Sequence, residues 1–89
     1  IASNSFISNL NITGKCLVDE LFLYEDMKTK KLANRSKLVL NEKVRVIFPM
    51  ISDAQTGTTW VKVLTITKIG TIYQYFVDMT DIPLEFSFN

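Results

Sequence analysis

The feature that most constrains the fold is a two-residue alternation of side-chain types, repeated in three segments. Residues 43–49 (KVRVIFP), 60–69 (WVKVLTITKI) and 71–77 (TIYQYFV) each place apolar or β-branched residues at every second position. Because successive side chains of a strand point to opposite faces of a sheet, this pattern predicts half-buried β-strands. The high β-branched content favours the same interpretation. Pro49 is expected to close the first strand.

Short polar segments separate these predicted strands. Residues 53–59 (DAQTGTT) contain Gly57, and residues 68–71 (KIGT) contain Gly70. Both segments predict hairpin connections, in which glycine supplies a positive φ at no steric cost. Residues 78–83 (DMTDIP) predict a single 3₁₀ or α turn before a final strand.

The N-terminal half allows two interpretations. Strands are expected at 15–24 (KCLVDELFLY) and 37–41 (KLVLN), with a polar loop over 25–37 between them. The competing interpretation is a helix over 18–33, which contains acidic and basic residues at helical spacing. We favour the strand because leucine alternates with phenylalanine at 21–23 and no capping pattern opens the segment.

The length of 89 residues predicts one domain, since two independent cores do not fit in so short a chain. We expect a single domain over 14–89. Residues 1–13, rich in Asn and Ser, are expected to be a linker or a loosely attached N-terminal strand. The first residue is Ile1 and not methionine, as in a mature product of cleavage or an excised part of a longer protein.

The residue types needed for most catalysis are missing from the sequence. It contains no histidine, one cysteine (Cys16) and three isolated glycines. These counts argue against a histidine general base, a Cys–His nucleophile, a zinc site and a glycine-rich phosphate loop. Adjacent carboxylates on a strand point to opposite faces, so they do not form an acid–base pair. We therefore expect a protein that is not an enzyme and that uses no cofactor or metal.

The charges balance overall but are unevenly placed. Ten basic and nine acidic residues give a net charge of +1, so no global field recruits nucleic acid or an anionic membrane. Bases nevertheless concentrate in the expected polar loop. We favour a solvated loop that protects strand edges over a docking surface for a polyanion. This basic loop comprises Lys28, Lys30, Lys31, Arg35 and Lys37.

Taken together, the order of elements resembles a bacterial Src-homology-3-type domain over about residues 15–83. The resemblance lies in a KVRVI strand at 43–47, a WVKV segment at 60–63, a glycine hairpin at Gly70 and a YFV strand at 75–77. The first strand departs from the family, because it carries LFLYEDM at 21–27 in place of the usual signature. The implied fold class is all-β, a small SH3-like barrel of about five or six antiparallel strands.

The resemblance also implies a function outside the cytoplasm. Members of the family bind cell-wall peptides or serve as adaptor domains, so it implies a binding module of a cell-envelope or secreted protein. The ligand would be a protein, a peptide or cell-wall peptidoglycan, held in an aromatic groove. The aromatics available for such a groove are Tyr24, Trp60, Tyr73 and Tyr75. The alternative is that Trp60 and Tyr75 are packing residues of the barrel.

Two other functions compete with this noncatalytic binding domain. The first is a structural or assembly subunit that makes protein–protein contacts through barrel edges, which would self-associate. The second is a small nucleic-acid-binding barrel, built from the basic loop and nearby Tyr24. The near-neutral net charge argues against nucleic acid. Apolar runs such as Val44–Ile51 are interrupted by charge or proline and are too short for a transmembrane helix.

Overall fold

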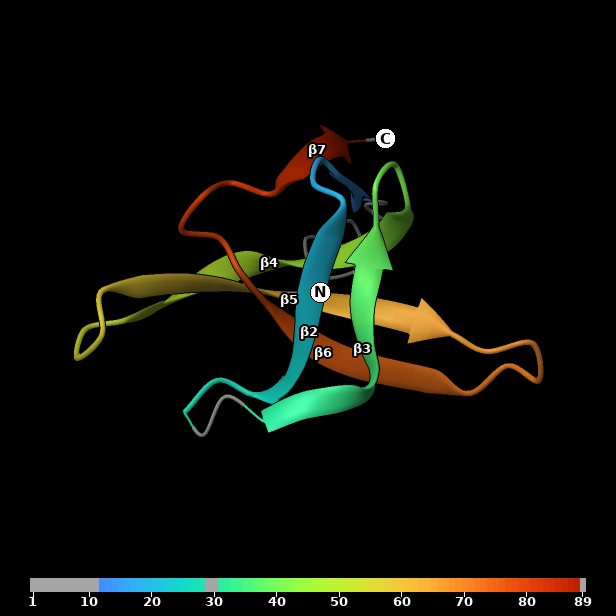
Figure 1. The fold of residues 1–89 in the computed structure, drawn as a ribbon, viewed down its shortest axis with the longest axis horizontal. Helices are drawn as coiled ribbons and strands as arrows, with labels where there is room; N and C mark the ends of the chain where they lie inside the picture. The colour runs from blue at the N-terminus through green and yellow to red at the C-terminus, as the bar shows by residue number, and fades with distance from the viewer. Residues whose placement is uncertain (1–11, 29–30, 89) are drawn as a thin grey trace, which may run out of the picture.

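The computed structural model describes residues 12–28 and 31–88, without the side chains of 33–36 (Figure 1). Within these residues all regular structure is strand and no helix occurs, which confirms the all-β class. The described part contains seven strands, compared with the five or six expected. They are β1 Ile12–Cys16, β2 Glu20–Asp26, β3 Lys31–Val39, β4 Lys43–Asp53, β5 Thr58–Ile66, β6 Ile72–Asp78 and β7 Leu84–Phe88.

The seven strands form one antiparallel sheet in the order β3-β2-β6-β5-β4-β1-β7. Strands β4, β5 and β6 are a meander, and the β2–β3 hairpin runs across it in Figure 1, so the sheet bends back on itself like a small barrel. Strand β1 lies between β4 and β7, and Ile12 at its start is opposite Phe88 at the end of β7. The first and last of the described strands are therefore neighbours.

The core lies inside this bend. The predicted alternation is confirmed over part of each central strand, where every second side chain faces the interior of the bent sheet. The side chains buried in this way are Val44 and Val46 in β4, Val61 and Val63 in β5, and Tyr75 and Val77 in β6. Each fully buried aliphatic side chain contributes roughly 1.5–3 kcal/mol relative to exposure. The cluster comprises Cys16, Leu21, Leu23, Leu38, Val44, Val46, Val61, Val63, Tyr75, Val77, Met79 and Leu84.

Gly14 allows β1 to fit between its neighbours. A Cβ atom at this position would lie 3.0 Å from Cγ2 of Val46 and 3.3 Å from Cδ1 of Leu84. A side chain there requires the side chains of Val46 and Leu84 to shift slightly, because both contacts are tighter than ordinary van der Waals packing. Glycine avoids this crowding.

Pro49 does not close its strand, contrary to the sequence prediction. Strand β4 continues through Pro49 to Asp53, and the Phe48–Pro49 peptide bond is cis. The register with β5 shifts between Ile47 and Ile51, so the proline lies within an irregularity of the ladder. A bulge tolerates proline because no ladder hydrogen bond has to be donated there.

The expected polar loop over 25–37 is also wrong, because most of it is the β2–β3 hairpin. Strand β2 continues to Asp26 and β3 begins at Lys31, with register shifts between them. Among the described strands, β3 pairs with β2 alone and lies at the edge of the sheet, so its polar residues do not have to be buried. The alternative helix over 18–33 is excluded by the strands at Glu20–Asp26 and from Lys31 onward.

The predicted strand over 15–24 is divided in two. Cys16 ends β1, and the chain turns before β2 begins at Glu20. The peptide N–H of Leu17 donates to the carbonyl of Pro83, at 2.9 Å, and Asn41 N–H donates to the Cys16 carbonyl, at 2.8 Å. These two hydrogen bonds satisfy backbone groups where the strand breaks.

The three predicted turns are confirmed. Gly57 has a φ of 72° and Gly70 a φ of 87°, the left-handed region in which glycine costs little. In the third turn the N–H of Ile82 donates to the carbonyl of Met79, at 3.0 Å, three residues back. Strand β1 begins at Ile12, so Ile12 and Thr13 are part of the sheet, while positions 1–11 lie outside the described residues.

Among the residues that the structure describes, no helix has the length and apolarity needed to cross a membrane.

Candidate binding groove

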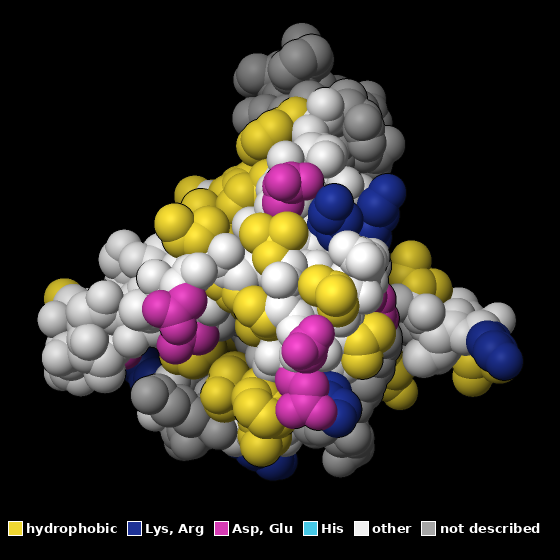
Figure 2. Space-filling model, turned by 45° about the horizontal axis from the view of Figure 1, so that its top comes forward, with side chains coloured by type: hydrophobic (Ala, Val, Ile, Leu, Met, Phe, Trp, Pro, Cys, Tyr) yellow, Lys and Arg dark blue, Asp and Glu magenta, His cyan; other side chains and the backbone are white. Residues whose placement is uncertain are grey.

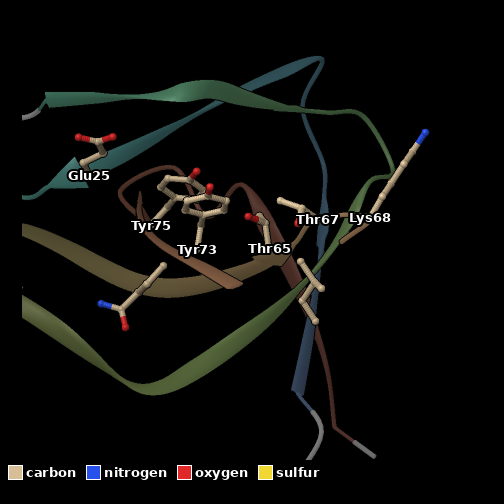
Figure 3. Close-up of a pocket in the computed structure, with 8 residues that line it drawn as sticks. Glu25, Thr65, Thr67, Lys68, Tyr73 and Tyr75 are labelled. Carbon is tan, nitrogen blue, oxygen red and sulfur yellow. The ribbon is translucent and has the colours of Figure 1, made fainter. Parts of the chain in front are cut away.

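An open groove lies beside the end of the β5–β6 hairpin (Figure 3). Its volume is about 590 Å³, which is within the range of roughly 300–1,000 Å³ typical of ligand pockets. Strands β5 and β6 and their connecting turn form most of the wall, and β2 adds one residue. The lining comprises Glu25, Thr65, Ile66, Thr67, Lys68, Tyr73, Gln74 and Tyr75.

Two tyrosines form an aromatic platform in this groove. Tyr73 and Tyr75 are two residues apart on β6, and their rings stack with centroids 6.2 Å apart and planes 14° apart (Figure 3). Tyr75 is only 6% exposed, whereas Tyr73 is 47% exposed. The buried ring therefore supports the exposed one, which keeps an amphipathic surface open to a ligand.

The groove has groups of opposite charge on its two sides. Glu25 on β2 and Lys68 in the β5–β6 turn appear on opposite sides of the tyrosines in Figure 3. One carboxylate oxygen of Glu25 lies 3.2 Å from Nζ of Lys31. No carboxylate of the described residues forms an ion pair with Lys68. The threonines and Gln74 add neutral hydrogen-bonding groups between the two charges.

The turn beside the groove is held by hydrogen bonds around Thr67. Its N–H donates to the carbonyl of Thr71, at 2.9 Å, and its own carbonyl accepts the N–H of Gly70, at 3.0 Å. The hydroxyl of Thr67 also accepts the N–H of Thr71, at 3.0 Å. Because these bonds join groups of the turn to one another, the turn itself organises this wall of the groove.

Trp60 and Tyr24 do not line this groove. Trp60 is 1% exposed, and its ring meets that of Tyr24 edge to face, with centroids 5.4 Å apart and planes at 85°. The indole Nε1 of Trp60 is buried, and no described residue forms a hydrogen bond with it. The structure thus places Trp60 as a packing residue, and the four aromatics named from the sequence separate into two pairs.

Of the basic loop, the structure describes the side chains of Lys28, Lys31 and Lys37. Lys31 and Lys37 lie on β3 and form ion pairs across the hairpin with Glu25, at 3.2 Å, and Glu20, at 2.7 Å. Lys28 is exposed in the turn that precedes β3. Lys30 and the side chain of Arg35 lie outside the described residues. Exposed pairs of this kind contribute about 0–1 kcal/mol each and leave less free charge for a polyanion.

Several groove residues were not predicted from the sequence. The alternation placed Ile66 and Gln74 on strands, but nothing in it indicated that the hairpin end would remain open beside Glu25. A second aromatic cluster was also missed. Phe48 contacts Phe86, with centroids 5.0 Å apart, and Phe88, with centroids 5.9 Å apart. The alternating phenylalanines of residues 84–88 (LEFSF) were the available signal.

Comparison of the chain with protein-family models, with curated proteins and with solved structures found no match. In the described part of the chain, no three Cys, Asp or Glu side chains gather as they would around a metal ion. The groove is therefore interpreted from its own geometry.

Proposed function

We propose that this protein is a noncatalytic binding domain that holds an extended peptide, free or within a cell-wall component, in the groove beside Tyr73. One observation carries the proposal. An exposed tyrosine is stacked on a buried one, in a groove of about 590 Å³ whose adjacent turn is already ordered. Exposed aromatic rings on a rigid support are frequent energetic centres of binding sites.

The chemistry of the lining favours a peptide as ligand. A peptide offers apolar side chains for the Tyr73 ring and backbone donors and acceptors for Thr65, Thr67 and Gln74. Glu25 and Lys68 attract groups of opposite charge at the two sides of the groove. A ligand with both an amino and a carboxylate group, such as a short wall peptide, would satisfy both.

The resemblance to a bacterial Src-homology-3-type domain adds support from the fold. The β4–β5–β6 meander and the turn before β7 agree with the family pattern. The polar loop of that pattern is replaced by the β2–β3 hairpin. The cell-wall ligand and a location outside the cytoplasm rest on this resemblance alone. The exposed side of the Tyr73 ring supports peptide binding, and this argument does not depend on where the protein is located.

The test compares two exposed aromatic side chains, one inside the groove and one outside it. We expect the folded domain to pellet with insoluble cell-wall sacculi, and soluble peptidoglycan fragments to shift the NMR signals of Tyr73. Tyr73→Ala should weaken binding by about tenfold or more, because it removes the exposed ring of the platform. Phe88→Ala, in a residue that is 68% exposed and does not line the groove, should leave binding unchanged.

Equal losses in Tyr73→Ala and Phe88→Ala would place the ligand elsewhere on the surface. Absence of pelleting by the folded wild-type chain, at both low and moderate salt, would remove the cell wall as ligand.

A second candidate function is assembly through the sheet edges. In the described part of the chain, β3 and β7 each pair with a strand on one side only, and β7 ends in the exposed Phe88. Such edges can pair with another chain. Sedimentation velocity distinguishes this function, since assembly predicts a concentration-dependent increase in mass that Phe88→Lys abolishes.

A further inference from the structure

The end of the β5–β6 hairpin exposes three isoleucines, which we call the isoleucine tip: Ile66, Ile69 and Ile72. Ile66 and Ile72 lie directly opposite each other on the two strands, and Ile69 is in the turn. They are 66%, 90% and 60% exposed, respectively. Single exposed apolar residues are normal on protein surfaces, but a contiguous group on a projecting element marks an interaction site.

The tip projects from the body of the protein. Figure 1 shows the β5–β6 hairpin extending beyond the other strands, and Figure 2 shows the same projection with hydrophobic and basic side chains at its end. The hydrogen bonds around Thr67 fix the turn in this shape. The exposure of Ile69 is therefore a property of an ordered turn.

Three cations accompany the isoleucine tip. Lys43 and Arg45 line a hollow together with Ile66, and Lys68 is next to Ile69 in the turn. No ion pair within the described residues involves any of these three cations, whereas Lys15, Lys31 and Lys37 each pair with a glutamate. Glu42, which also lines the hollow, accepts a hydrogen bond from the N–H of Val39, at 3.2 Å.

We propose that the isoleucine tip docks on an anionic phospholipid surface. Apolar side chains flanked by Lys and Arg are the composition that enters the boundary between headgroups and acyl chains. Each cation near an anionic leaflet adds attraction, so free cations beside the tip complement the lipid charge. A stable protein–protein interface needs roughly 800 Å² per partner, far more than three isoleucines expose. Binding to a lipid surface does not require this minimum buried area, because a projecting hairpin end can enter the lipid by itself.

The docking surface can be tested separately from the groove. Ile66 and Lys68 line both, but Ile69, Ile72, Lys43 and Arg45 do not line the groove. Changes at Ile69 and Lys43 therefore test lipid binding without altering a residue of the groove. Failure of peptide binding in the groove would leave the lipid experiment interpretable.

The experiment is flotation of the whole chain with vesicles of phosphatidylglycerol and phosphatidylethanolamine, compared with vesicles of phosphatidylcholine. We expect flotation with the anionic vesicles only, reduced at high salt. Ile69→Ser should weaken vesicle binding by about tenfold, since it removes one isoleucine side chain that would be buried in the lipid. Lys43→Gln should weaken it by about fivefold. Both substituted side chains are exposed, so the circular dichroism spectrum should not change.

Two matched controls lie outside the tip. Ile82→Asn replaces an isoleucine that is 68% exposed and has a φ of 47°, a conformation that asparagine tolerates. Lys28→Gln removes an exposed cation beside the β4–β5 hairpin, at the other end of β5. Both controls should float like the wild type. Absence of flotation, or equal losses in the controls, would overturn the proposal. Concentration-dependent self-association that Ile69→Ser abolishes would show instead that a second copy covers the tip.

Discussion

The pair Tyr24–Trp60 and the pair Tyr73–Tyr75 differ from the burial that strand alternation predicts, and they differ in opposite directions. Trp60 shares its face of β5 with Lys62 and Leu64, which is the outer face of the meander, yet it is 1% exposed. Tyr73 shares its face of β6 with the buried Tyr75 and Val77, yet it is 47% exposed. The alternation therefore assigns a residue to a face of the sheet but does not say whether that face is covered.

The β2–β3 hairpin covers one part of the β4–β5–β6 meander and leaves another part open, depending on where it crosses. Strand β2 pairs with β6 at a single position, Tyr24 opposite Phe76, close to the Trp60 end of the two strands. Tyr24 thereby reaches the edge of the Trp60 ring. The other end of the meander extends past this crossing, so its core face stays open and becomes the groove.

The substitution Trp60→Ala gives the largest test of whether Trp60 is enclosed while Tyr73 is at the surface. We expect the free energy of unfolding to fall by about 3–5 kcal/mol, because a large buried side chain is removed and a cavity is left. That is a large part of the total stability of such a domain, about 4–13 kcal/mol. Urea unfolding followed by circular dichroism measures the change. A loss below about 1 kcal/mol would show that Trp60 is not enclosed.

A smaller contrast is expected within the second pair. Tyr75→Ala should lower the free energy of unfolding by about 3 kcal/mol, because Tyr75 is a core residue. Tyr73→Ala should lower it by less than about 1 kcal/mol, since its ring is half exposed. Thermal unfolding of the two variants beside the wild type gives both values. Similar losses at the two positions would contradict the assignment of one as support and the other as surface.

The smallest expected effect is the direct coupling between rings. A double-mutant cycle with Tyr24→Leu and Trp60→Leu should give a coupling energy of about 0.5–1.5 kcal/mol, the range for edge-to-face aromatic contacts. The same cycle with Tyr73→Leu and Tyr75→Leu should give less, because one of its rings faces water. Equal coupling energies would show that burial does not distinguish the two pairs.

Sequence reasoning identified the strands whose burial repeats every second residue, because core packing requires that pattern in β4, β5 and β6. It also identified Gly57 and Gly70, whose positive φ leaves a clear residue preference. The strand expected at 37–41 overlaps the end of β3, but the first part of β3, residues 31–36, was missed. A strand at the edge of the described sheet can be polar, as at Lys31, and then lacks the hydrophobic alternation. The path of β4 through Pro49 was missed because a register shift leaves no trace in hydrophobic periodicity.

The candidate site was predicted only in part, because the bend of the sheet brings together residues that are distant in the sequence. Tyr73 and Tyr75 were named from residue type, and the structure brings them together in the groove. Glu25 and Lys68 lie 43 positions apart in the chain and meet the same groove only because β2 crosses the meander. Such a juxtaposition depends on the bend of the whole sheet, which local periodicity does not encode.

The pairing of β1 with β7, the first and last of the described strands, has a consequence for the response of this domain to force. Ile12 lies opposite Phe88, and the antiparallel register continues inward to Cys16 opposite Leu84. A pull applied at Ile12 and Phe88 therefore loads the β1–β7 pairs one after another, as when a zipper is opened, and does not shear them all at once. Tethered through these two points, the domain is expected to lose β7 first, because β7 pairs with β1 alone among the described strands.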